Sequence, residues 1–182
     1  MCIRDRDSIV AGKYVYVADG QGGVMVLWFA PVTSGTIPPT GGTYISEVDG
    51  TTYVFPAGVF TDTIILTHVP VPGATVPDTG DLTGIEHFFD VTAVYSSTGL
   101  PAQLVPGTIF TISVAYADAE QGMVNADSLQ LHHWNAVQWS TDGITKVEVG
   151  AENVVASQVN HLSLFGVLGS MRRVYLPLVL RH

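Results

Sequence analysis

Short segments in which apolar and polar residues alternate recur along most of the chain. Such alternation places every second side chain on one face of a β-strand. In the segment TIFTISVAYADA, Phe110, Ile112 and Val114 alternate with Thr111 and Ser113. Turn residues separate these segments at short intervals. The pattern predicts an all-β fold, an antiparallel β-sandwich over residues 43–169.

Individual strands and turns follow from the same pattern. In TDTIILTHVPV, Ile64, Leu66 and His68 share one face. Two strands are expected to meet near Asn135 and Ala136, a further hairpin lies in ITKVEVGAENVVASQV, and HLSLFGVLG is expected to be the closing strand. The segment DAEQGMVNADSL suits a helix, but Gly122 breaks it.

Residues 8–30 predict a β-hairpin whose two strands flank the turn sequence DGQGG. The pattern GKYVYVADGQGGVMVL resembles one blade of an LVIVD-type β-propeller repeat. The resemblance implies that residues 7–30 are a propeller remnant, with further blades upstream, although a hairpin of the main domain is an open alternative. Residues 31–42, rich in Pro, Gly, Ser and Thr, have the composition of a linker.

The charge balance excludes one class of function. The chain of 182 residues has 7 Lys and Arg against 16 Asp and Glu, a net charge of −9. Nucleic-acid binding needs clustered cations, so we expect no such partner. No apolar run is long enough for a membrane-spanning helix. Abundant Thr, Val and Gly suit an extracellular, secreted β-protein.

The first six residues, MCIRDR, resemble a translated adapter from transposase-based sequencing libraries. We therefore treat residues 1–6 as an artefact and expect the natural protein to extend upstream of Asp7. Cys2 is the only cysteine, which excludes an intrachain disulfide.

Two stretches resemble known extracellular modules. The opening GGTYISEVDGTTYVFPAGVF resembles the Zu-five module of ankyrins and netrin receptors, and the matching residues are Gly41, Gly42, Val54, Phe55, Pro56, Ala57 and Gly58. The end resembles the proteolysis-site segment of adhesion-receptor GAIN domains, at Trp134, Trp139, Ser140, Gly143, Asn160, His161, Leu162, Ser163, Phe165, Val167 and Leu168. Together the resemblances imply one β-sandwich over most of residues 41–169.

The GAIN resemblance implies candidate chemistry at His161, Leu162 and Ser163. His161 would accept the proton of the Ser163 hydroxyl, and the activated oxygen would attack the Leu162 carbonyl in an N→O acyl shift. The resulting ester would be hydrolysed between residues 162 and 163. Residues i and i+2 of a strand share one face, so the spacing permits this transfer.

Two observations limit this hypothesis. The receptor segment carries paired cysteines that staple the cleavage turn, whereas this chain has Ile144 and residues 156–158 there. His161 and Ser163 also fit a second interpretation, as polar members of a closing strand whose apolar residues fill the core.

Other candidate ligand sites are weaker. Adjacent strand residues such as His132 and His133 point to opposite faces, so they do not chelate one ion easily. No nucleophile elbow, phosphate loop or HExxH motif is present, and we expect no cofactor or metal. A carbohydrate platform made by Trp28, Trp134 and Trp139 is a further hypothesis. It is set against core packing of Trp134 and Trp139, which match packing positions of the resembled family.

The tail, residues 170–182, contains MRRVYLPLVLRH and resembles the short tail of many secreted proteins of filamentous, Chloroflexi-like bacteria. It suits an export or attachment tag, or an added edge strand. The sequence thus favours a non-catalytic accessory or stalk module of a larger secreted bacterial protein. Its expected partners are the upstream propeller of the same chain and a cell-surface protein or glycan. The alternatives are a self-cleaving sandwich and, less favoured, a carbohydrate-binding module.

Overall fold

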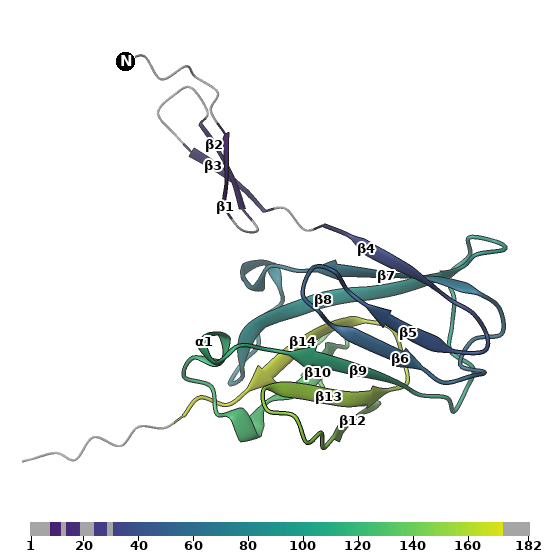
Figure 1. The fold of residues 1–182 in the computed structure, drawn as a ribbon. Helices are drawn as coiled ribbons and strands as arrows, with labels where there is room; N and C mark the ends of the chain where they lie inside the picture. Colours follow the sequence, from purple (N-terminus) through teal and green to yellow (C-terminus); the bar gives the residue numbers. More distant parts are fainter. Residues whose placement is uncertain (1–7, 12–13, 19–23, 29–30, 173–182) are drawn as a thin grey trace, which may run out of the picture.

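Two antiparallel sheets pack face to face around one apolar core in the computed structural model (Figure 1). The structure describes residues 8–11, 14–18, 24–28 and 31–172. The six-stranded sheet has the order β11-β10-β14-β8-β7-β4 and the five-stranded sheet the order β12-β13-β9-β6-β5. The predicted all-β sandwich is confirmed.

The strands of the larger sheet are β4 (Thr33–Ile37), β7 (Ile64–Pro70), β8 (Thr83–Tyr95), β10 (Gln130–Trp134), β11 (Trp139–Ser140) and β14 (Leu164–Gly169). Those of the smaller sheet are β5 (Gly42–Ile45), β6 (Thr52–Phe55), β9 (Phe110–Ala115), β12 (Ile144–Val147) and β13 (Val154–Val159). Three short helical turns connect them, η1 (Gly73–Thr75), α1 (Asp118–Gln121) and η2 (Ala126–Ser128). Gly122 ends α1 with a positive φ of 53°, as its position in the sequence predicts.

The N-terminal strands β1 (Ser8–Ala11), β2 (Tyr14–Ala18) and β3 (Val24–Trp28) form a separate antiparallel sheet. Pairing of β2 with β3 confirms the predicted hairpin, and β1 adds a strand to it. Residues 1–7, the predicted turn sequence at residues 19–23 and the side chain of Trp28 lie outside the described part of the structure. The propeller origin of the hairpin stays a prediction.

The predicted linker at residues 31–42 is wrong over Thr33–Ile37. These residues form β4, which pairs with β7 along its length and is the edge of the larger sheet. An edge strand needs few apolar side chains, and in β4 only Ile37 is buried. The sandwich therefore begins at Thr33, earlier than the predicted boundary at residue 43.

The inner core follows from the predicted alternation. Ile64, Leu66 and His68 are fully buried on one face of β7, and Phe110 and Ile112 are buried on β9. Large aromatic side chains fill the space between the sheets, where burying each one stabilises the fold by about 1.5–3 kcal/mol. The largest of them are Tyr53, Phe89, Phe110 and Phe165.

After β14 the chain continues along the sandwich as far as Arg172. Met171 makes a bridge with Val124, and the Arg172 amide donates to the Met123 carbonyl at 2.8 Å. Residues 173–182, most of the predicted tail, lie outside the described residues. Within the described part of the chain, no helix is long and apolar enough to cross a membrane.

Candidate functional site

The segment His161, Leu162 and Ser163 lies just before β14 rather than within it. The predicted shared strand face of His161 and Ser163 is therefore wrong, because β14 begins at Leu164. The His161 Nε2 lies 3.2 Å from the Asp142 carbonyl oxygen, which can only accept, so Nε2 is the donor. The His161 ring stacks on Phe165 with centroids 5.7 Å apart and lies 4.2 Å from the His133 ring.

Ser163 is hydrogen-bonded to other strands. Its hydroxyl donates to the Trp134 carbonyl at 3.4 Å, and its carbonyl accepts from the Val91 amide at 3.0 Å. Leu162 is half-buried against the inner core. Although both side chains are described, no hydrogen bond joins His161 to Ser163. The two groups that self-cleavage requires are each bonded to a different backbone carbonyl.

No residue from Asn160 to Leu164 has a positive φ. Among the described residues other than glycine, positive φ occurs only at Glu86, Ala136 and Asn153. The positions where the resembled receptors carry paired cysteines, Ile144 and residues 156–158, lie in the regular antiparallel ladder between β12 and β13. The segment therefore lacks the left-handed backbone conformation that commonly stores strain at functional sites.

His133 is the most perturbed group beside this segment. Burial lowers its pKa below the ordinary 6.5, and the neighbouring His161 lowers it further against the opposing effect of Asp142. Its Nε2 is buried without a hydrogen-bond partner. Both effects favour a neutral imidazole at pH 7, as expected for a packed side chain.

A second, smaller apolar cluster covers the opposite face of the larger sheet. We call Phe88, Trp139 and Leu168 the outer cluster. It packs beneath the connection between β7 and β8, residues 71–82, which we call the outer loop; its apolar residues Val71, Val76 and Leu82 contact the cluster. The Trp139 Nε1 donates to the Pro77 carbonyl at 3.2 Å, which fixes the loop over the sheet.

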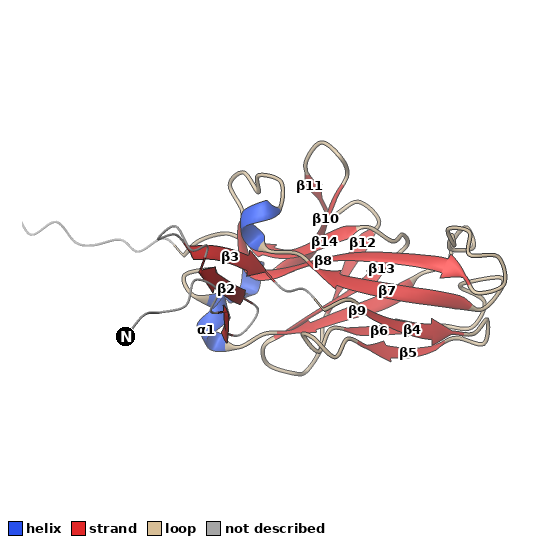
Figure 2. Ribbon diagram, turned by 90° about the horizontal axis from the view of Figure 1, so that it is seen from above, coloured by secondary structure: helices blue, strands red, loops and turns tan. Residues whose placement is uncertain are grey.

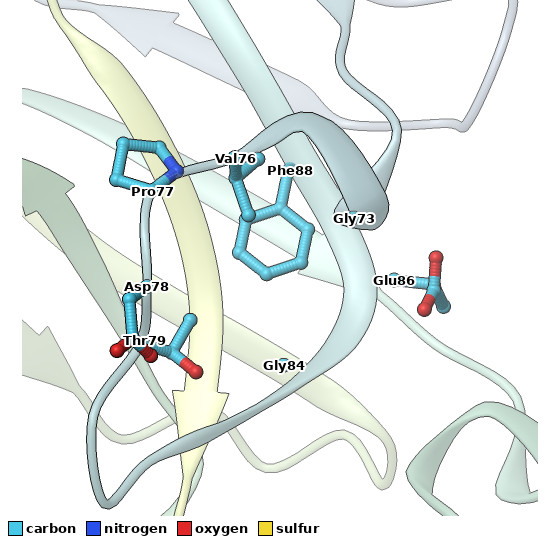
Figure 3. A pocket seen from close by; sticks show the side chains of 8 residues that line it. All are labelled: Gly73, Val76, Pro77, Asp78, Thr79, Gly84, Glu86 and Phe88. Carbon is cyan, nitrogen blue, oxygen red and sulfur yellow. The ribbon is translucent and has the colours of Figure 1, made fainter.

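Two hollows meet at Asp78 and Thr79 of the outer loop. The first, of about 250 Å³, is drawn in Figure 3, where Glu86 lies across from these two residues and Val76 lies beside the Phe88 ring. We call it the Glu86 hollow; it is lined by Gly73, Val76, Pro77, Asp78, Thr79, Gly84, Glu86 and Phe88. The second, of about 360 Å³, we call the Trp134 hollow; it is lined by Asp78, Thr79, Gly80, Leu82, Trp134, Val137, Gln138 and Trp139.

An irregularity in β8 places Glu86 at the first hollow. Phe88 pairs with Gly166 and Gly84 pairs with Leu168, so residues 85–87 stand opposite Val167 alone. Within this bulge Glu86 has a φ of 67°, a rare conformation for a residue with a side chain. Bulges re-aim side chains and are frequent next to functional sites.

The inner core contains a polar chain that the sequence did not predict. The Tyr53 hydroxyl lies 2.5 Å from Nδ1 of His68, whose Nε2 lies 3.0 Å from Oδ2 of Asp49. Nε2 has no aligned hydrogen bond, so the contact is best described as an ion-pair contact. Burial raises the pKa of Tyr53 well above its ordinary value, and the charge of Asp49 adds to this.

The described residues contain no group of three His, Cys, Asp or Glu side chains placed to hold a metal ion. Trp139 is buried, as the core interpretation predicted, whereas Trp134 is half-buried and lines the Trp134 hollow. Sequence reasoning missed the hollows because the outer loop looks like an ordinary connection. The only signal was the adjacent pair Phe88 and Phe89, which gives a strand an aromatic side chain on each face.

No family model matches this chain, and no curated protein matches it either.

Proposed function

We propose that the chain is a non-catalytic interaction module of an extracellular, secreted bacterial protein, with a cell-surface protein or glycan as its partner. One observation carries the proposal: the larger sheet holds a long loop on its outer face by means of a dedicated aromatic cluster. This cluster is separate from the inner core, so it is not needed to join the two sheets. Loops placed on a rigid scaffold are the usual carriers of binding.

The composition supports the extracellular part of the proposal. Charged residues are few, and Thr, Val and Gly residues are many. The resemblances to Zu-five and GAIN modules, and that of the tail to secreted bacterial proteins, agree with it.

The alternative, self-cleavage between Leu162 and Ser163, is less favoured by the geometry. A general base must reach the proton that it removes, directly or through one water. His161 instead uses Nε2 to bind the Asp142 carbonyl, and the Ser163 hydroxyl binds the Trp134 carbonyl.

A denaturing mass measurement of the full chain separates the two functions. We expect the intact mass after prolonged incubation at pH 7. A fragment comprising residues 163–182 that is absent from the Ser163→Ala variant would overturn the non-catalytic proposal. His161→Ala provides the matched control, because loss of the base would also abolish genuine self-cleavage but would not abolish cleavage by a contaminating protease.

A further inference from the structure

The two hollows share Asp78 and Thr79 in their linings, and we call the two together the groove. Phe88 holds the outer loop from below, and its ring lies so close to the backbone of Gly84 and Gly166 that an added Cβ would be 2.3 and 2.6 Å from it. The Asp78 side chain accepts from the Gly80 amide at 3.0 Å, and the Thr79 hydroxyl donates to the Leu82 carbonyl at 2.8 Å. Each of these two side chains is therefore hydrogen-bonded within the loop.

The other wall is the hairpin between β10 and β11, which projects from the sandwich in Figure 2. The Asn135 side chain accepts from the amides of Val137 and Gln138 at 3.0 and 2.9 Å, and Ala136 has a φ of 72°. These bonds stiffen the tip of the hairpin. Val137 is 81% exposed there, at the rim of the Trp134 hollow.

The chemistry of the lining residues restricts the ligand. Asp78 and Glu86 contribute exposed carboxylates, and none of the residues that line either hollow is Lys or Arg. Such a lining accepts hydrogen bonds and repels anions. Phosphorylated, sulfated or acidic ligands are thereby disfavoured.

The Trp134 hollow adds an apolar surface to these acceptors. Trp134 and Leu82 lie beside Thr79 and the side-chain amide of Gln138, which can both donate and accept. Small-molecule sites commonly combine an aromatic surface with a few convergent polar groups. A pyranose ring has an apolar C–H face and hydroxyl donors around its rim, so it matches both properties.

From this combination we infer that the groove between Trp134 and Glu86 binds a short neutral oligosaccharide. One sugar ring would lie in the Trp134 hollow and donate its hydroxyls to Asp78, and the next sugar would lie in the Glu86 hollow and donate to Glu86. The inference rests on the proposed interaction function and names its ligand class. This inference explains the bulge at Glu86. The bulge would turn the Glu86 carboxylate toward the neighbouring sugar, and the positive φ of Glu86 is the cost in backbone strain.

A basic peptide is the competing ligand class, and the groove fits it less well. Exposed ion pairs contribute about 0–1 kcal/mol and are screened by salt. Both carboxylates are exposed, so a lysine or arginine side chain would gain little from them. The apolar surface beside Trp134 would remain unused by a cation at Glu86, at the other end of the groove.

The test uses calorimetric titration of the full chain with neutral gluco-, xylo- and manno-oligosaccharides, an oligogalacturonate and a lysine- and arginine-rich peptide. We expect a neutral oligosaccharide to bind in the micromolar to millimolar range, with affinity independent of salt between 50 and 500 mM, because a neutral ligand releases no counterions. Trp134→Ala should weaken binding about tenfold, or about 1.4 kcal/mol. Gln138→Ala, at an exposed position, should weaken it by a smaller factor without affecting folding.

Thr92→Ala is the matched control, since Thr92 is exposed on β8, the strand that carries Glu86, and lines neither hollow. Circular dichroism melting checks that each variant is folded; if Trp134→Ala unfolds, Gln138→Ala decides. Three results would overturn the inference: no neutral sugar binds, binding survives in the folded variants, or only the peptide binds and Asp78→Asn with Glu86→Gln abolishes it. If one of these three results is obtained and the cleavage test gives an intact mass, only the sugar ligand is rejected. The proposed non-catalytic interaction function is then not contradicted.

Discussion

Two adjacent phenylalanines of β8 belong to different parts of the molecule. Phe89 is fully buried in the inner core, where its ring lies 5.9 Å from that of Phe165 on β14. Phe88 is buried in the outer cluster, 5.6 Å from Trp139. The inner core joins two sheets whose strands are far apart in sequence, whereas the outer cluster joins a sheet to one loop. The inner core therefore holds the fold, and the outer cluster shapes a surface.

The polar groups of the two regions differ in the same way. In the inner core, Tyr53 of the smaller sheet and His68 of the larger sheet connect across the sandwich to Asp49. In the outer cluster the polar link is one hydrogen bond from Trp139 to the Pro77 carbonyl. Loss of the first should affect the whole fold, and loss of the second should affect the loop.

Phe89→Ala should have the largest effect on stability. Truncating a fully buried phenylalanine costs about 3–5 kcal/mol, from lost transfer free energy and the cavity that remains. Phe88→Ala should cost less, because the outer loop can settle into the space or water can enter it. Urea unfolding followed by circular dichroism measures both. Equal losses would remove the distinction between the regions and place Phe88 in the same cooperative unit as Phe89.

Asp49→Asn should have the next largest effect, and one that depends on pH. Burial by itself would raise the pKa of Asp49, but the contact with His68, the charge of His68 and the Thr51 amide together hold it well below its ordinary 3.8. A hydrogen bond or contact of this kind with a charged group contributes about 1.5–3 kcal/mol. We expect a loss of that size at pH 6.

The sign of the pH dependence follows from the lowered pKa. A carboxyl group with a lower pKa in the folded state stabilises the fold fully above its unfolded pKa, and this stabilisation is lost as the pH falls below about 4. Wild-type protein should lose stability from pH 5 to pH 2, and Asp49→Asn should lose less over the same interval. Asp81→Asn, at an exposed carboxylate of the outer loop, is the control and should change the profile little. Parallel profiles for wild type and Asp49→Asn would contradict the assignment.

The inner core could be predicted well from the sequence because a buried strand face has a period of two residues. The alternation in TDTIILTHVPV predicts Ile64, Leu66 and His68 on one face, and all three are fully buried. The edge strand β4 was not predicted, because only Ile37 is buried there and its other residues have the composition of a linker. An edge is recognised by its pairing partner, which the local sequence does not specify.

The outer region could not be predicted for related reasons. The bulge at residues 85–87 is defined by how β8 pairs with β14. Its register therefore depends on a strand much later in the sequence, which local patterns do not encode.

Two further features could not be predicted from local sequence either. Asp49 was expected only as a turn residue, and nothing near it in sequence indicates contact with His68. The spacing of His161 and Ser163 was suggestive only if the strand included both, and it begins at Leu164.

Gly166→Ala should have a moderate effect that is concentrated in the outer region. An added Cβ would lie 2.6 Å from the Phe88 ring, so the ring must move, and overpacking of this kind costs about 1–3 kcal/mol. The Val71 amide, which donates to the Phe88 carbonyl at 2.7 Å, should then exchange its hydrogen faster. Gly150→Ala is the matched control, because a Cβ there would meet no atom within 4 Å. Slower exchange or unchanged stability in Gly166→Ala would show that the ring does not hold the loop.

Ser163→Ala should have the smallest effect, even though Ser163 is the residue that the sequence singled out. Its hydroxyl makes one long hydrogen bond, 3.4 Å to the Trp134 carbonyl, and ordinary hydrogen bonds contribute about 0.5–1.5 kcal/mol. A carbonyl with two lone pairs tolerates the loss, so we expect a value near the lower end by urea unfolding. Ser163 lies between the two regions, because its backbone bonds to Val91 of the inner face and its hydroxyl to the hairpin strand beside the groove. A loss above about 2 kcal/mol would mean that this bond anchors the β10–β11 hairpin. In that case Ser163→Ala should also weaken binding in the groove, since the hairpin carries Trp134 and Gln138.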